Sequence, residues 1–311
     1  MARVCLSILS LFIVVAALPG AGAQPPKEAS PPPREKPLPE VRIGLPDVLF
    51  RDVSPAMVDL AMVPFKDMIQ KTLEMNGSLI KARDYKVLAE QLKKKQVDLV
   101  LLHGFEYAWV KEIEPDLNLI PLAVTLPNCG KVQACLVVHD SCQAKLPKDL
   151  TGACVAVPKG SKAHCQMFLE HIRKGLPEGD CCPSEVKGPL PTPEDVLDGI
   201  ASGCGASKAA LVDISSLEAY QADKPGLGSN LKILAKSELL PAAVIACRKD
   251  TLTAKQMDAI TKGLVECTNN PKGRLFVMFW NLKGFGKVTP EYLDLVAKTQ
   301  KAYPVPANPK K

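Results

Sequence analysis

A short polar segment in the middle of the chain has the residue types of an anion site. The apolar run Ala153–Val157 leads through a glycine turn into Ser161, Lys162, Ala163 and His164. Because the first N–H groups of a helix have no acceptor within the helix, a helix capped by Ser161 would present the N–H groups of residues 162–164 beside two basic side chains. Such a helix start is a natural site for a small anion. The alternative is structural: Ser161 only caps its own helix, and Lys162 and His164 are solvated.

A second strand end carries a comparable set of side chains. The apolar run Val97–Leu102 is followed by His103, Gly104, Phe105, Glu106 and Tyr107. Tyr107 could donate its hydroxyl to an oxyanion, or it could pack as a core aromatic. Glu106 would repel an anion, so it either points away or accepts a donor of the solute. His103 lines the site or is simply a hydrogen-bonded structural histidine.

A third candidate region is the loop that follows the first expected strand. Asp47 and Arg51 lie there, and loops of this kind often carry ligand-binding residues. In open α/β sheets, ligands bind beyond the carboxyl ends of the strands, so two such ends that face each other would form a cleft. The predicted ligand-binding residues are Ser161, Lys162, Ala163, His164, Tyr107, Glu106, His103 and Asp47.

Motifs of the common enzyme classes do not occur in this sequence. It contains no G-x-S-x-G, P-loop, G-x-G-x-x-G or H-E-x-x-H. His164 and Cys165 are adjacent, so they cannot face each other as base and nucleophile on one helix. We therefore predict a protein that is not an enzyme, with no catalytic residues and no cofactor.

Cysteine is frequent in this chain, which has eleven in 311 residues. Ten remain if the segment with Cys5 is removed, and an even number in an exported chain predicts disulfides. No spacing matches a zinc pattern, so disulfides are preferred to a metal cluster, and no metal site is predicted. Most bridges are expected among Cys135, Cys142, Cys154, Cys165, Cys181, Cys182 and Cys204.

The first 23 residues have the pattern of an export signal. Arg3 precedes the apolar run Val4–Leu18, and Ala21–Ala23 forms a small-residue cleavage site. The apolar run of about 15 residues is short for a membrane span, although an uncleaved anchor remains the alternative. Proline-rich residues 24–40 are expected to be a linker. The mature protein is thus predicted to be soluble and periplasmic or otherwise exported.

Charge and composition argue against a nucleic-acid partner. Removing Arg3 lowers the net charge from +6 to +5, acidic and basic residues are interspersed, and aromatic residues make up 5% of the chain. A nucleic-acid site would need a basic face with interleaved aromatic residues. The mild positive charge suits a small anionic solute better.

The elements that must position these residues alternate between strand and helix. Strands are expected at residues 41–45, 78–82, 97–102, 118–125, 131–139, 153–157, 208–213, 231–235 and 243–247. Helices are expected at 55–75, 84–95, after 104, at 192–202, 215–221, 253–267, 271–280 and 289–301, and residues 175–193 are expected to form an irregular loop. This alternation predicts an α/β fold with mainly parallel sheets flanked by helices.

The order of these pieces resembles the periplasmic solute-binding proteins of phosphonate, phosphite and phosphate ABC transporters, within the type II periplasmic-binding-protein and transferrin group. The matching pieces are Val41–Pro46, Arg83–Tyr85, Val97–Val100, Gly104–Tyr107, Leu136–Val138, Asp149–Gly152, the strand leading to Ser161, Ile233–Ser237 and Leu240–Arg248. The resemblance covers about residues 41–300 and implies two α/β lobes joined by two hinge strands. It places lobe 1 at 41–132 and 242–311, the inserted lobe 2 at 133–241, and the hinges near 131–135 and 239–244.

The sequence departs from that family at the ligand. The family's clamping turn is a Ser/Thr-Ser-Gly run, whereas this chain has Gly160–His164, and the family's His-Asp pair is absent from Val186–Pro189. The resemblance implies an exported monomer that captures a small, anionic, phosphonate- or phosphate-like solute for an ABC-transporter permease. The alternative is a sensory or scaffold protein on the same fold that regulates a membrane partner.

Overall fold

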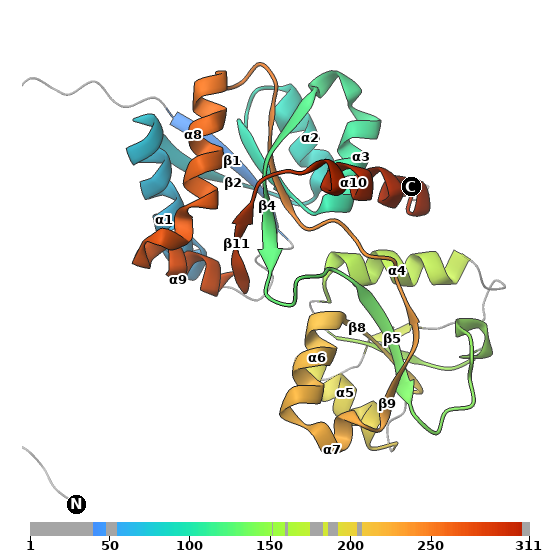
Figure 1. Ribbon diagram of the computed structural model, residues 1–311. Coiled ribbons are helices and arrows are strands. Elements are labelled where there is room, and N and C mark those ends of the chain that lie inside the picture. The colour runs from blue at the N-terminus through green and yellow to red at the C-terminus, as the bar shows by residue number, and fades with distance from the viewer. Residues whose placement is uncertain are drawn as a thin grey trace, which may run out of the picture. The chain divides into compact units, whose positions relative to one another are not determined.

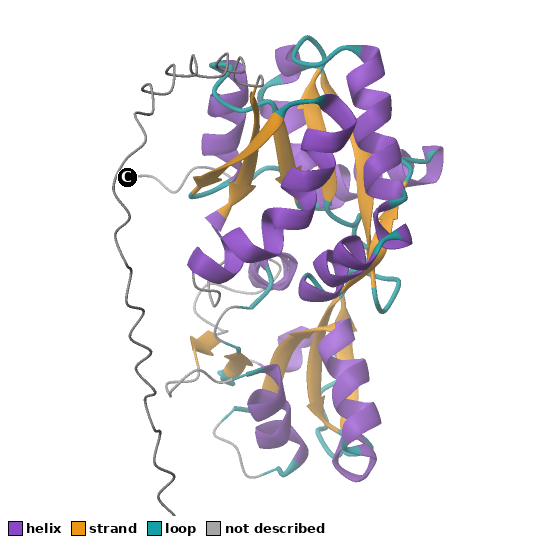
Figure 2. Ribbon diagram, turned by 90° about the vertical axis from the view of Figure 1, so that its left-hand side faces the viewer, coloured by secondary structure: helices purple, strands orange, loops and turns teal. Residues whose placement is uncertain are grey.

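The computed structural model describes residues 40–47, 55–150, 152–158, 161–174, 183–185, 192–203 and 207–306. The chain divides into two units, Met1–Pro37 and Leu38–Lys311, and all described residues belong to the second. Within these residues the strands form two sheets, and helices flank both of them (Figures 1 and 2). The predicted two-lobed α/β fold is confirmed.

The first sheet has the strand order β11-β4-β10-β3-β1-β2 in the described part of the chain. Its members are β1 (Glu40–Pro46), β2 (Asn76–Ala82), β3 (Leu99–Leu102), β4 (Leu119–Pro127), β10 (Val244–Arg248) and β11 (Leu282–Gly286). Strand β1 pairs in parallel with β2 and β3, whereas β10 is antiparallel to β3 and β4, and β11 is antiparallel to β4. Strands β1 to β4 therefore share one direction, and their carboxyl ends lie at one edge.

Two layers of helices cover the first sheet (Figure 1). The helices α1 (Pro55–Leu73), α8 (Ala254–Val265) and α9 (Pro271–Phe279) lie on one face, and α2 (Tyr85–Lys93), α3 (Gly104–Ile113) and α10 (Pro290–Ala302) lie on the other. Local capping fixes several helix starts: Asp84 accepts from the N–H groups of Lys86 and Val87, and Thr253 forms a capping box with Gln256. Each face buries its own apolar cluster.

The second sheet has the order β7-β6-β8-β5-β9 among the described residues. Its members are β5 (Ala134–His139), β6 (Val155–Val157), β7 (Pro183–Glu185), β8 (Ala209–Asp213) and β9 (Leu231–Lys236). Strand β6 is parallel to β7 and β8, and β5 is antiparallel to β8 and β9. The helices α4 (Ala163–Lys174), α5 (Pro193–Ala201), α6 (Ile214–Asp223) and α7 (Pro225–Gly228) flank this sheet. Strand β7 lies where the sequence predicts an irregular loop.

Two segments connect the sheets and lie against each other. Residues 128–133 lead from β4 to β5, and residues 237–243 lead from β9 to β10 (Figure 1). The N–H of Leu240 donates to the carbonyl of Val132 over 2.9 Å. The buried Ser237 hydroxyl accepts from the N–H of Ala134 at 3.0 Å and donates to the carbonyl of Glu238 at 2.8 Å. The two segments thus form a hydrogen-bonded pair.

The expectation that most cysteines form disulfides is wrong for the described part of the chain. The cysteines with free thiols there are Cys129, Cys135, Cys142, Cys154, Cys165, Cys247 and Cys267. Cys135, Cys165 and Cys247 are buried in the apolar clusters, and burial raises the pKa of the Cys135 thiol to about 11. They therefore serve as small apolar side chains. Cys181, Cys182 and Cys204 lie outside the described residues.

The export signal and the proline-rich linker also lie outside the described residues. Among the helices that are described, none combines the length and the apolar character that crossing a membrane requires.

Candidate functional site

The carboxyl end of the second sheet carries a buried carboxylate that the sequence analysis did not select. Asp213 is the last residue of β8 and the cap of α6, where its side chain accepts from the N–H of Ser215 at 2.9 Å. It is only 6% exposed. A buried carboxylate must be paired or hydrogen-bonded to remain charged, so its partners define this part of the site.

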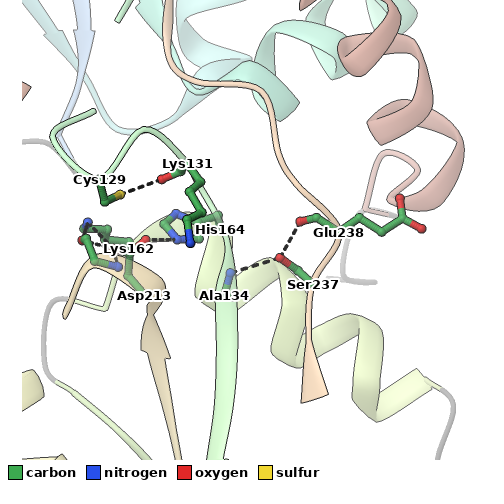
Figure 3. Close-up of polar contacts among 9 residues, drawn as sticks. Cys129, Lys131, Ala134, Lys162, His164, Asp213, Ser237 and Glu238 are labelled. Atoms are coloured by element: carbon green, nitrogen blue, oxygen red, sulfur yellow. Dashed lines mark hydrogen bonds and ion pairs between the residues drawn. The ribbon is translucent and has the colours of Figure 1, made fainter. Parts of the chain in front are cut away.

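Three side chains converge on Asp213 (Figure 3). The Nζ of Lys162 lies 2.9 Å from Oδ1, and the Nε2 of His164 lies 2.7 Å from Oδ2. The hydroxyl of Ser215 also donates to Oδ1 and accepts from Nζ of Lys162 at 3.2 Å. The two basic residues predicted from the sequence are therefore held by one carboxylate about 50 positions further along the chain.

This arrangement sets the charges of the group. Burial by itself would raise the pKa of Asp213, but the hydrogen bond from His164 and the positive charge of Lys162 hold it well below its usual range. Burial lowers the pKa of His164, and the nearby positive charges of Lys162 and His103 lower it further, against the opposing effect of Asp213. His164 is therefore a neutral donor to an ionised carboxylate at neutral pH.

The helix after Ser161 begins slightly later than its sequence suggests. Helix α4 starts at Ala163, and Ser161 is buried just before it. The recorded hydrogen bonds of the described residues do not use the N–H groups of Ala163 and His164. A first helical turn leaves its N–H groups without an acceptor inside the helix.

The carboxyl end of the first sheet carries a different pair. His103 is the N-cap of α3, and its own N–H donates to Oε2 of Glu106 at 3.1 Å. The Nδ1 of His103 lies 2.7 Å from the same oxygen. Glu106 thus satisfies a helix start and holds a histidine ring in place. The carboxylate of Glu106, whose role the sequence analysis left open, therefore has a local partner in His103.

The two sheet edges come together at His103 and His164. His103 lies close enough to His164 for its charge to lower the pKa of that residue. In addition, Ala163 and Met167 of α4 pack against the apolar cluster beneath α2 and α3. Ser161, Lys162, Ala163 and His164 therefore share one region with His103 and Glu106.

Two predicted residues have other placements. Tyr107 is 1% exposed, and its hydroxyl donates to the carbonyl of Leu119 at 3.4 Å. Leu119 is the first residue of β4, so this hydroxyl points toward the opposite edge of the sheet, and the structural interpretation of Tyr107 fits its placement better. Asp47 is exposed directly after β1, at the carboxyl edge, and Arg51, four residues further along, lies outside the described part.

A buried phenol at the start of α2 was also missed by the sequence analysis. The hydroxyl of Tyr85, at the start of α2, has no hydrogen-bond partner among the described residues. Burial raises its pKa to about 12, with a contribution from the carboxylate of Glu106. Its ring lies 5.2 Å from that of Trp109, measured between centroids. Among the described residues, the Tyr85 hydroxyl is thus a buried donor without a partner.

A signal for Asp213 and Tyr85 was present in the sequence. Each lies at a junction between an expected strand and an expected helix, the position at which α/β proteins place ligand-binding groups. Metal binding has no support in the described residues, where no group of three or more His, Cys, Asp or Glu side chains could hold an ion. The site is suited to hydrogen bonding and charge recognition.

The comparisons with known proteins agree with this geometry. The family model described as "ABC transporter, phosphonate, periplasmic substrate-binding protein" matches residues 49–293. A search of curated proteins finds no significant match.

Solved structures with the same fold include three binding proteins of low sequence identity. XAC2383 from Xanthomonas citri, bound to a chloride ion, has a TM-score of 0.63 and 14% identity, over 85% of this chain and 97% of its own. PhnD1 from Prochlorococcus marinus, in complex with methylphosphonate, has a TM-score of 0.57 and 14% identity, over 84% and 97%. A binding protein component of an ABC phosphonate transporter from Pseudomonas aeruginosa has a TM-score of 0.54 and 14% identity, over 85% and 88%. Likeness at this level of identity shows the fold.

Proposed function

This chain belongs to the phosphonate-type periplasmic substrate-binding proteins of ABC transporters, and from that premise we propose that it captures a small oxyanion of the phosphonate or phosphate class. The family consists of transporter solute-binding proteins and not of enzymes, so a small solute and a membrane permease are the expected partners. The family does not fix the charge of the solute, so the proposal that it is an anion must be argued from the groups of the site.

The start of α4 carries this proposal. Its first N–H groups, those of Ala163 and His164, have no acceptor among the recorded hydrogen bonds of the described residues. Lys162 donates to Asp213 and Ser215, which uses two of the three N–H bonds of its ammonium group. Its side chain is 52% exposed, so the third N–H is available to a solute. Charge-assisted bonds from such donors to an oxyanion are short and strong.

The opposite side of the bound solute would meet the first sheet. His103 is half-buried and fixed by Glu106. In the described part of the chain the hydroxyl of Tyr85, at the start of α2, has no partner. Because Ala163 and Met167 of α4 pack against the apolar cluster of α2 and α3, an anion at the start of α4 would lie close to the first sheet. Ser161 is buried, so we expect backbone N–H groups in this chain to replace the hydroxyls of the family's Ser/Thr-Ser-Gly clamp.

The lobes that close on the solute follow the sheets. We place lobe 1 at residues 41–132 and 242–311 and lobe 2 at 133–241, with the hinge in the connecting segments. The hydrogen bonds between Leu240 and Val132 and between Ser237 and Ala134 support a paired hinge. We further propose that the chain is exported, is cleaved near Ala23, keeps residues 24–40 as a linker, and works as a monomer.

Calorimetry with a panel of oxyanions tests the proposal. Methylphosphonate, phosphite, phosphate and sulfate are titrated into the protein without its first 23 residues and into the Lys162→Ala variant. Loss of a charged hydrogen bond should weaken binding of the preferred anion by about tenfold or more. Lys255→Ala, at an exposed position of α8, removes the same charge away from the site and should leave the affinity unchanged.

Two results would contradict this assignment. One is the absence of binding by every member of the panel. The other is a Lys162→Ala protein that is still folded and binds the anion as tightly as the parent.

A further inference from the structure

Helix α10 is fixed both to the helices of the first sheet and to a segment that joins the two sheets. Its residue Val296 lies in the apolar cluster beneath α2 and α3, and the side-chain amide of Gln300 donates to the carboxylate of Glu112 on α3 at 2.9 Å (Figure 1). Near the start of α10, the hydroxyl of Tyr292 donates to the carbonyl of Ala242 at 2.9 Å. Ala242 belongs to the segment between β9 and β10, so α10 braces this connection.

Tyr303, directly after α10, contacts the apolar clusters of both sheets. Its side chain is 5% exposed and lies in the cluster of the second sheet, together with Phe168 and Leu169 of α4. The centroid of its ring lies 4.9 Å from that of His171 on the same helix. Its backbone carbonyl, in contrast, accepts from Nε1 of Trp109 at 2.8 Å. Trp109 lies on α3 in the cluster of the first sheet, so this one residue fastens the two sheets to each other.

Trp109 connects this contact with the candidate site. The centroid of its ring lies 5.2 Å from that of Tyr85 and 5.0 Å from that of Phe105, which it meets edge-on. Tyr85 carries the buried hydroxyl described above, and Phe105 lies two residues after His103. Because protein interiors are close-packed, a displacement of one buried ring is felt by the rings around it. The position of Tyr303 therefore bears on the edge of the first sheet.

The two connecting segments alone would leave the sheets free to rotate. They lie against each other as one pair, joined by the hydrogen bond between Leu240 and Val132, and a short paired connection of this kind can act as a hinge. Tyr303 adds a contact between the sheets that is made by a side chain and not by the course of the chain. An aromatic ring buries a large apolar area, so this contact favours one arrangement of the sheets over others.

We propose that Tyr303 is a positioning residue for the solute site: it holds the two sheets at the separation at which both edges reach one solute. The inference rests on the proposed function and adds a residue that sets the affinity without touching the solute. A solute that meets a preformed arrangement does not have to shift the sheets toward it, which raises the apparent affinity. Without the Tyr303 ring, the empty protein would populate arrangements in which the two edges lie further apart.

Small-angle X-ray scattering and calorimetry on the protein purified after export test this inference. Empty Tyr303→Ala should have a larger radius of gyration than the parent, and saturating methylphosphonate should restore the value of the parent. If only about one molecule in ten holds the competent arrangement, the affinity for methylphosphonate should fall about tenfold. A merely structural role would lower the melting temperature without either of these changes.

Phe65→Ala is the matched control. Phe65 is buried to nearly the same extent as Tyr303, but it lies in the cluster between the first sheet and α1. Its loss should lower the melting temperature through the cavity that it leaves. The radius of gyration and the affinity for methylphosphonate should remain those of the parent.

A milder variant approaches the same contact from the other side. Trp109→Phe keeps a ring against Tyr85 and removes the N–H that donates to the carbonyl of Tyr303. Both readouts should change in the same direction as in Tyr303→Ala, by a smaller amount. This variant keeps the experiment decisive if Tyr303→Ala does not fold, because unchanged values in Trp109→Phe would then overturn the inference.

The outcomes separate the two proposals. An unchanged radius of gyration in folded Tyr303→Ala would overturn the inference about Tyr303 and leave the proposed function intact. Equal changes in Tyr303→Ala and Phe65→Ala, or an increased radius with unchanged affinity in Tyr303→Ala, would do the same. Absence of binding by every oxyanion of the panel to the parent itself would overturn the proposed function, and with it the role of Tyr303 in affinity.

Discussion

The two sheet edges that meet at the site are built in opposite ways. At the edge of the second sheet, Asp213 is buried and receives donors from Lys162, His164 and Ser215. At the edge of the first sheet, Glu106 bonds its local neighbour His103 and no other side chain among the hydrogen bonds of the described residues. The first arrangement gathers three donors on one buried acceptor, and the second is a single local pair. Their difference predicts that substitutions at the second sheet will cost more stability than those at the first.

Asp213→Ala should produce the largest effect. It removes the shared acceptor and leaves His164 buried without its partner, so the free energy of unfolding should fall by about 3 kcal/mol. Urea denaturation measures this change. The control Asp258→Ala removes an exposed carboxylate of α8 and should stay within about 0.5 kcal/mol of the parent. If Asp213→Ala and Asp258→Ala lost the same free energy of unfolding, the proposed difference between the two sheet edges would be wrong.

Glu106→Ala should have a smaller effect, of about 1–2 kcal/mol, because it removes one capping box and one ring contact. Gln256→Ala removes the comparable capping box of α8. Because that capping box is more exposed, the loss in free energy of unfolding should be smaller. The same denaturation experiment compares them. A loss for Glu106→Ala that equals or exceeds that of Asp213→Ala would reverse the order proposed for the two edges.

The pH dependence of stability should report on His164. Its pKa is lowered in the folded protein, so below about pH 6.5 the unfolded chain binds more protons at this residue than the folded one. Stability should thus be complete above that pH and decrease as the pH falls toward the folded-state pKa. Melting temperatures between pH 7.5 and 5.5 should fall less in His164→Asn than in the parent. An identical slope in both proteins would show that His164 is not the responsible group.

Tyr107→Phe should have the smallest effect. Its hydroxyl makes a long bond of 3.4 Å to the carbonyl of Leu119, so the loss of stability should remain under about 1 kcal/mol. Anion affinity should not change, because the hydroxyl points away from the site. A clear loss of affinity in calorimetry would restore the role first inferred from the sequence.

The sequence predicted most elements of the fold because their signals are local. Buried strands such as β3 and β5 are continuous apolar runs, and helices such as α2 and α8 begin at recognisable caps. Strand β11 was missed because Gly284 and Gly286 make its local sequence a weak strand former. Its pairing with β4 nevertheless makes it a strand in the folded protein. The free cysteines were misjudged because burial cannot be read from cysteine spacing.

The candidate site was predicted only in part, because half of it depends on long-range contacts. Ser161, Lys162, Ala163 and His164 were found by their position before a helix. Asp213, which holds two of them, is about 50 residues away, and no local pattern joins the two segments. Tyr107 was assigned to the site from its place after a strand, but one helical turn separates it from His103 and directs its ring into the core.

The central position of β10 has a consequence for the order in which the molecule can form. Strand β10 lies between β3 and β4, yet the chain reaches it only after every described strand of the second sheet. During synthesis from the N-terminus, β3 and β4 therefore have no strand to join them while β5 to β9 can already pair. Because domains generally fold as units in the order of their synthesis, we expect the second sheet to assemble first. The edge that carries Asp213 would then exist before the edge that carries Glu106.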